Sequence, residues 1–117
     1  MKATNPYLKR SAVLLERKGK EHKVAIWRAA AEILSRTSSG RVEVNLTRLT
    51  RVAQGSSPLF VPGKVLGTGS SGKRLVVGAF SYSASARSKI VEAGGEALGV
   101  EEFLRRFPKG SGVLLVE

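Results

Sequence analysis

Two uninterrupted apolar runs in the second half of the chain constrain its fold more than any other feature of the sequence. They are Leu59-Phe60-Val61 and Leu75-Val76-Val77-Gly78-Ala79-Phe80. A strand with one face in water alternates apolar and polar residues, so continuous runs indicate strands that are buried on both faces. Between them, Pro62 to Lys73 is expected to form a long Gly/Ser loop. The runs therefore predict strands in the second half of the chain, and with helices elsewhere, an α/β fold class.

The first half of the chain predicts helices. Asn5 is a capping residue and Pro6 suits the first helical position, so a helix is expected to begin there, carry Leu8, Ala12 and Leu15 inward, and end at Gly19. A second helix is expected from about Glu21 to Arg36, with an apolar stripe at helical spacing made of Val24, Trp27, Ala31 and Leu34.

Shorter elements follow at several places. Val42, Val44 and Leu46 alternate briefly, and Asn45 is expected to cap a short helix. Ser85 is expected to cap another helix, which Gly94-Gly95 ends. A last helix carries Val100, Phe103, Leu104 and Phe107 on one face, Pro108 stops it, and a strand is expected at 113–116.

The length of 117 residues predicts one small domain. We expect a basic helical N-terminal part at about residues 1–54 and an α/β part at about residues 55–117.

The charge of the chain indicates a polyanionic partner. The sequence has 20 Lys and Arg against 9 acidic residues, a net charge of +11, and residues 1–51 hold twelve of the basic residues but only four glutamates. Aromatic residues make up 6%, which disfavours recognition of single strands by stacking and favours phosphate and shape recognition of folded RNA. The candidate RNA-binding residues are Lys2, Lys9, Arg10, Arg17, Lys18, Lys20, Lys23, Arg28, Arg48, Arg51, Lys64, Lys73, Arg74, Arg87 and Lys89.

Several other functions lack the residues they need. There is no Cys, and His22 is the single histidine, so neither a Cys site nor a His cluster can hold a metal. The scattered glutamates suggest no close pair for acid–base catalysis, and His22, which lies among lysines, is expected to be a surface residue and not a catalytic base. The sequence shows no signal peptide and no apolar run of bilayer length, so a cytoplasmic protein without a membrane partner is expected. A basic membrane helix is also disfavoured, because the helix faces are needed for the core.

One segment looks like a nucleotide-binding motif. Gly67 to Arg74 contains a GxGxxG pattern and stands one residue short of a P-loop. Both motifs need a helix directly after the loop, whereas Leu75-Val76-Val77 predicts a strand. Arg74 stands where a P-loop has its magnesium-binding hydroxyl, and the chain has no Asp for a second ligand. We expect the loop at Pro62–Arg74 to contact RNA through Lys64, Lys73 and Arg74 at its two ends, and we expect no small-molecule substrate. The alternative is a flexible Gly/Ser hairpin loop that only connects two strands.

Five segments together resemble one known family. They are Thr4-Asn5-Pro6-Tyr7-Leu8, Glu43-Val44-Asn45-Leu46 with Arg48, Val61-Pro62-Gly63-Lys64-Val65-Leu66-Gly67, Ala86 through Lys89-Ile90 to Gly94-Gly95-Glu96, and Pro108-Lys109-Gly110. Their order and spacing over Thr4 to Val116 are similar to those of the ribosomal protein L-eighteen-e family of archaea and eukaryotes, which is related to ribosomal protein L-fifteen. The short ends resemble the archaeal form.

The resemblance implies a fold in which irregular strand–strand–helix turns follow N-terminal helices. It implies binding to large-subunit ribosomal RNA, contact with neighbouring large-subunit ribosomal proteins, no catalysis and no cofactor. Lys64 and Arg48 are the basic residues that match the family segments, and the other candidates rest on charge alone. Two alternatives stay open: a free-standing basic nucleic-acid-binding accessory protein, and a P-loop-like nucleotide enzyme.

Overall fold

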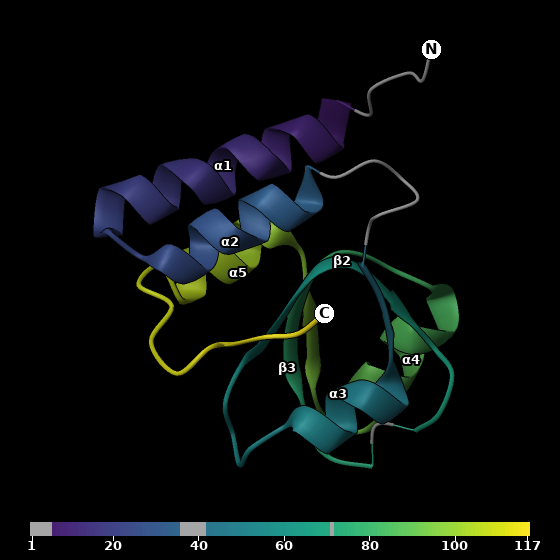
Figure 1. Ribbon diagram of the computed structural model, residues 1–117. Coiled ribbons are helices and arrows are strands. Elements are labelled where there is room, and N and C mark those ends of the chain that lie inside the picture. The colour runs from purple at the N-terminus through teal and green to yellow at the C-terminus, as the bar shows by residue number, and fades with distance from the viewer. Residues whose placement is uncertain (1–5, 36–41, 71) are drawn as a thin grey trace.

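Five helices and five strands make up the part of the chain that the computed structural model describes, which is residues 6–35, 42–70 and 72–117 (Figure 1). In chain order they are α1 (Pro6–His22), α2 (Ala25–Leu34), β1 (Val42–Asn45), α3 (Leu46–Val52), β2 (Leu59–Leu66), β3 (Val76–Tyr82), α4 (Ala84–Glu92), β4 (Glu96–Leu98), α5 (Val100–Arg106) and β5 (Leu114–Leu115). The α/β fold class is confirmed.

The strands form one parallel sheet. Its order is β1-β2-β3-β4, and β5 pairs in parallel with the beginning of β2. Because β3 occupies one edge of β2, β1 and β5 share the other edge, β5 beside Leu59 and Phe60 and β1 beside residues 63–66. The apolar runs that predicted strands lie in the two central strands, β2 and β3. The short strand β4 was missed, because three residues give no readable alternation.

Helices cover both faces of this sheet and make two separate cores. On one face α1, α2 and α5 pack around Phe60, and on the other α3 and α4 pack around Leu59 and Val61. Neighbouring residues of β2 thus enter opposite cores, as the period of two in a strand requires. The prediction of strands buried on both faces is confirmed, and Figure 1 shows α1, α2 and α5 together on one side of the sheet.

The boundary between the first two helices differs from the prediction. Gly19 does not end α1, which continues to His22; Lys23 ends it with φ of 56°, and Val24 is the N-cap residue of α2. The expected start of the second helix at Glu21 is therefore wrong, and its expected end at Arg36 lies outside the described residues. Gly19 serves packing instead, since a Cβ there would lie 2.5 Å from Cγ of Arg28.

Two predictions in the second half are also wrong. Ser83, and not Ser85, caps α4, and its hydroxyl accepts from the amide of Ala86 at 3.1 Å. The expected loop at Pro62–Lys73 begins too early, because Pro62 to Leu66 continue β2. A proline inside a central strand is accommodated by a bulge, and the register of β2 with β3 shifts between Val61 and Lys64. The loop is no hairpin, because β2 and β3 are parallel.

Three further boundaries agree with the sequence. Asn45 caps α3 and accepts from the amide of Arg48 at 2.9 Å. Helix α5 buries Val100, Phe103 and Leu104, and β5 lies within the expected segment 113–116.

Candidate RNA interface

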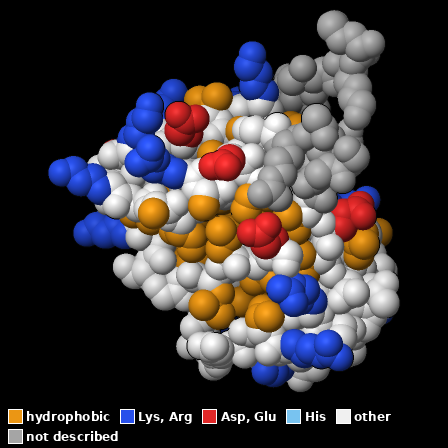
Figure 2. Space-filling view, in the orientation of Figure 1, with side chains coloured by type: hydrophobic (Ala, Val, Ile, Leu, Met, Phe, Trp, Pro, Cys, Tyr) orange, Lys and Arg blue, Asp and Glu red, His pale blue; other side chains and the backbone are white. Residues whose placement is uncertain are grey.

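The candidate basic residues fall into two groups according to whether they have partners inside the protein. Lys2 lies outside the described residues. Five of the others form side-chain contacts within the fold, and nine form no hydrogen bond or ion pair with another described residue: Lys9, Arg10, Arg17, Lys23, Arg28, Arg51, Lys64, Lys73 and Arg74. A cation without an internal partner is free to bind a phosphate, so these nine are the better candidates for RNA contacts. Figure 2 shows basic side chains gathered near the turn from α1 to α2 and over α3.

Two of the five partnered residues lie on α1. Lys18 forms an ion pair with Glu21 at 3.6 Å, and Lys20 pairs with Glu16 at 3.7 Å. Both pairs are on the helix surface, where such contacts are weak. Each lysine nevertheless has a neighbouring carboxylate, which weakens its attraction to an RNA phosphate.

Arg48 and Arg87 donate to backbone carbonyls. Nε of Arg48 lies 2.9 Å from the carbonyl oxygen of Glu117, which ties α3 to the end of the chain. Arg87 donates to the carbonyl of Ala97 at 3.4 Å and lies 5.0 Å above the ring of Tyr82. Burial raises the pKa of Tyr82 far above its usual range, and its hydroxyl lies 2.7 Å from the carbonyl oxygen of Leu98. Both arginines therefore have structural roles.

Lys89 holds the Gly-rich loop at residues 67–75. Its Nζ donates to the carbonyl oxygens of Gly67 at 2.7 Å and Gly69 at 2.9 Å. From the other side, the amide of Leu46 donates to the carbonyl of Thr68 at 3.1 Å. The loop passes so close to α3 that a Cβ at Gly69 would overlap the side chain of Thr47. The first half of the loop is therefore fixed between α3 and α4, unlike the flexible connector that was the alternative.

The second half of the loop carries Lys73 and Arg74. Both side chains are exposed, and together with Lys89 and the backbone of Gly72 they line an open hollow of about 550 Å³. Glu92 is the acidic residue on its rim. Three cations around one open hollow make a favourable environment for a phosphate group.

Lys64 does not join this group. It is exposed near the carboxyl end of β2, beside Glu43 of β1. Because β2 and β3 are parallel, the loop carries the chain back to the amino end of β3, where Lys73 and Arg74 lie. The two ends of the loop therefore lie towards opposite ends of the sheet, and one phosphate cannot contact all three cations.

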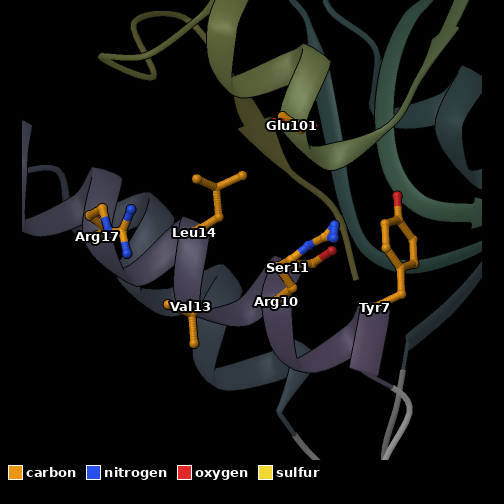
Figure 3. A pocket seen from close by; sticks show the side chains of 7 residues that line it. All are labelled: Tyr7, Arg10, Ser11, Val13, Leu14, Arg17 and Glu101. Carbon is orange, nitrogen blue, oxygen red and sulfur yellow. The ribbon is translucent and has the colours of Figure 1, made fainter.

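A second concavity lies between α1 and α5, lined by Tyr7, Arg10, Ser11, Val13, Leu14, Arg17 and Glu101. Its volume is about 250 Å³, and Figure 3 shows Arg10 and Arg17 along α1 with Glu101 on the facing helix. The sequence singled out both arginines but missed Tyr7, which is 51% exposed. An exposed tyrosine in the first turn of a basic helix was the signal available.

Replacing Lys89 with methionine is expected to loosen the loop while keeping the apolar stem of the side chain. Two charge-assisted hydrogen bonds to loop carbonyls are lost, so hydrogen exchange at the amide of Leu46, which donates to the carbonyl of Thr68 in the same loop, should accelerate severalfold. Arg51→Met removes an exposed charge that has no partner among the described residues and is the matched control. Equal exchange at the amide of Leu46 in both variants would contradict the role of Lys89.

The structure offers no support for nucleotide chemistry at the loop. The segment after it is the strand β3, whereas a P-loop or a GxGxxG motif leads directly into a helix. Among the described residues, no group of three or more His, Asp or Glu side chains could hold a metal ion. Within the same residues, no helix is long and apolar enough to cross a membrane.

Comparison with known proteins agrees with the family resemblance in the sequence. A family model whose description covers the ribosomal proteins 50S-L15 and 50S-L18e, together with a 60S ribosomal protein, matches residues 24–98. The large ribosomal subunit protein eL18 of Pyrobaculum aerophilum is 39% identical over 113 residues, which cover 97% of this chain and 93% of the relative. The protein of the same name from Archaeoglobus fulgidus is 39% identical over 116 residues, covering 99% of both chains. The relative from Methanococcus maripaludis is 36% identical over 114 residues, covering 97% of this chain and 95% of the relative. The chain therefore belongs to this family of ribosomal proteins.

Proposed function

We propose that this chain is a structural constituent of the large ribosomal subunit in the cytoplasm, where it binds folded large-subunit ribosomal RNA and contacts neighbouring ribosomal proteins. The observation that carries the proposal is the similarity over nearly the full length to proteins named large ribosomal subunit protein eL18. The net charge of +11 supports an RNA partner, because a polyanion relieves the repulsion within such a protein.

The distribution of the unpartnered cations supports recognition of phosphates on a folded RNA. These residues lie on α1, α2, α3, β2, the α1–α2 turn and the loop at 67–75, so they are spread over the sheet and the helices on both of its faces. Cations on several elements match phosphates presented by several RNA segments, and such contacts fix the position of a protein without reading bases. No catalytic step is proposed.

Binding to large-subunit ribosomal RNA is expected to weaken steeply with salt. Each phosphate contact contributes about −0.7 to −0.9 to the slope of log affinity against log salt, so about six contacts give a slope near −4 to −5. The variant Lys73→Gln with Arg74→Gln should flatten this slope by about one unit per lost contact. Titrations at several salt concentrations measure both values.

The matched control is Lys18→Gln with Lys20→Gln, which removes the same charge from residues that already have glutamate partners. Its slope should stay closer to that of the unmodified protein. A flat slope for the unmodified protein would refute the electrostatic argument. Failure to co-sediment with large subunits at moderate salt, with RNA binding intact, would instead favour a free-standing nucleic-acid-binding accessory protein.

A further inference from the structure

Tyr7 presents an aromatic ring at the surface in a fixed orientation. It is 51% exposed, and its ring stacks on Phe80 of β3 with 5.1 Å between the ring centroids and 30° between the planes. Stacking on Phe80 uses one face of the ring. Tyr7 is therefore a half-exposed aromatic residue whose ring orientation is set by its contact with the sheet.

Two guanidinium groups accompany this ring along α1. Arg10 and Arg17 line the same groove as Tyr7, and neither forms a hydrogen bond or ion pair with another described residue (Figure 3). They are two helical turns apart, about 10 Å along the axis. A guanidinium is a strong ligand for a phosphate and keeps its charge at every physiological pH.

The rest of the groove limits what can enter. Buried Ser11 and half-buried Leu14 lie beneath, and Glu101 of α5 lies on the opposite side. A volume of about 250 Å³ is smaller than the ~300–1,000 Å³ of pockets for drug-sized ligands, so the groove suits a group no larger than about one nucleobase. A carboxylate beside the groove repels phosphates there but accepts a hydrogen bond from an amino group of a base.

We propose that this groove binds one unpaired nucleotide of the RNA partner, with the base stacked on Tyr7 and the adjoining phosphates bound by Arg10 and Arg17. The inference rests on the proposed function, because it specifies one contact within that complex. Glu101 then accepts from an exocyclic amino group, which cytosine, adenine and guanine have and uracil lacks. Alternation of an aromatic ring with cations is the pattern that single-stranded segments need. It adds local base recognition to a surface that otherwise contacts phosphates.

The test uses the full-length protein and two probes, short single-stranded oligoribonucleotides of cytidine alone and of uridine alone, with affinity measured by fluorescence anisotropy. Tyr7→Ala should weaken oligocytidine binding by about five- to 150-fold, the range for one stacked base, whereas Tyr7→Phe should keep most of the affinity. Glu101→Gln should raise the affinity for oligouridine, because a negative charge is removed, and lower the ratio of cytidine to uridine affinity.

Charge-matched variants separate the groove from general electrostatics. Arg10→Gln with Arg17→Gln should flatten the salt slope by about 1.4, the value for two single-strand contacts. Lys18→Gln with Lys20→Gln removes the same charge from the same helix outside the groove and should change the slope less. Both arginines lack internal partners among the described residues, so the comparison holds even if Tyr7→Ala lowers the melting temperature.

The proposal is overturned if oligocytidine binds the Tyr7→Ala protein as tightly as the unmodified protein, or if both double variants change the slope equally. Competition by polyglutamate as effective as that by RNA would assign the groove to an acidic protein segment and overturn it as well. Co-sedimentation of unmodified protein with large subunits is measured in parallel. Its failure refutes the proposed function, whereas intact co-sedimentation with unchanged Tyr7→Ala affinity refutes the groove alone.

Discussion

Replacing Trp27 with alanine should lower the free energy of unfolding by about 3–5 kcal/mol, the usual cost of removing a fully buried large aromatic side chain. Trp27 is 0% exposed and contacts Phe60 and Phe103 edge to face, at 5.4 and 6.1 Å between ring centroids. Its Nε1 also donates to the carbonyl oxygen of Pro108 at 2.9 Å, which holds the segment after α5 against α2. The expected loss is a large fraction of the free energy of unfolding of a typical protein, which is ~5–15 kcal/mol.

Urea denaturation followed by circular dichroism measures this change without relying on tryptophan fluorescence. Val13→Ala is the control, since Val13 is a large apolar residue on α1 that is 49% exposed. Its effect should stay within about 0.5 kcal/mol, as for most surface substitutions. A loss below about 1 kcal/mol for Trp27→Ala would mean that α2 does not pack on the sheet as the structure shows.

The second large effect is expected for Gly63→Ala, at the bulge of β2. A Cβ at Gly63 would overlap the backbone carbonyl of Val42 in the neighbouring strand β1, and backbone atoms cannot move aside as a flexible side chain can. Inserting a methyl group into such a space typically costs about 1–3 kcal/mol, and the backbone clash favours the upper end. The strand β1 would separate from β2, and α3 follows β1 directly in the chain.

Thermal unfolding of Gly63→Ala and Gly99→Ala gives the matched comparison. A Cβ at Gly99 would meet only the hydroxyl oxygen of Tyr7, at an ordinary 3.8 Å, so this variant should lose no more than the few tenths of a kcal/mol to ~1 kcal/mol of a glycine N-cap. Separation of β1 from β2 would also displace Leu46, which follows β1 directly in the chain. The amide of Leu46 donates to the loop carbonyl of Thr68, so its hydrogen exchange should accelerate in Gly63→Ala. Equal melting temperatures for the two variants would rule out the close approach of β1 and β2 at Gly63.

Local signals in the sequence predicted the elements well where one residue type decides the local structure. Asn45 caps α3 as expected, because a side-chain oxygen can reach the third amide after it in any helix. The apolar runs predicted β2 and β3 for a similar reason, since burial on both faces requires apolar residues at every position.

Predictions were wrong where a contact with a distant part of the chain decides the local structure. Gly19 is a helix breaker by intrinsic preference, yet it lies inside α1 because Arg28 of α2 packs on the space that a side chain would fill. Pro62 indicates a loop by its missing amide, yet it lies in β2 because the bulge accommodates it. Neither contact leaves a trace in the neighbouring sequence.

The candidate RNA surface shows the same division. The sequence by itself determined that the partner carries negative charge, since the net charge of +11 follows from composition. Family membership likewise follows from the order of short segments in the sequence. Only the tertiary structure decided which cations can act on RNA. Lys89 donates to loop carbonyls and Arg87 to the sheet, whereas Arg10 and Arg17 stay without partners among the described residues and share a groove with Tyr7. A charge is a property of one residue, but its availability depends on which acceptors the fold brings within about 3 to 4 Å of it, and those acceptors come from remote parts of the chain.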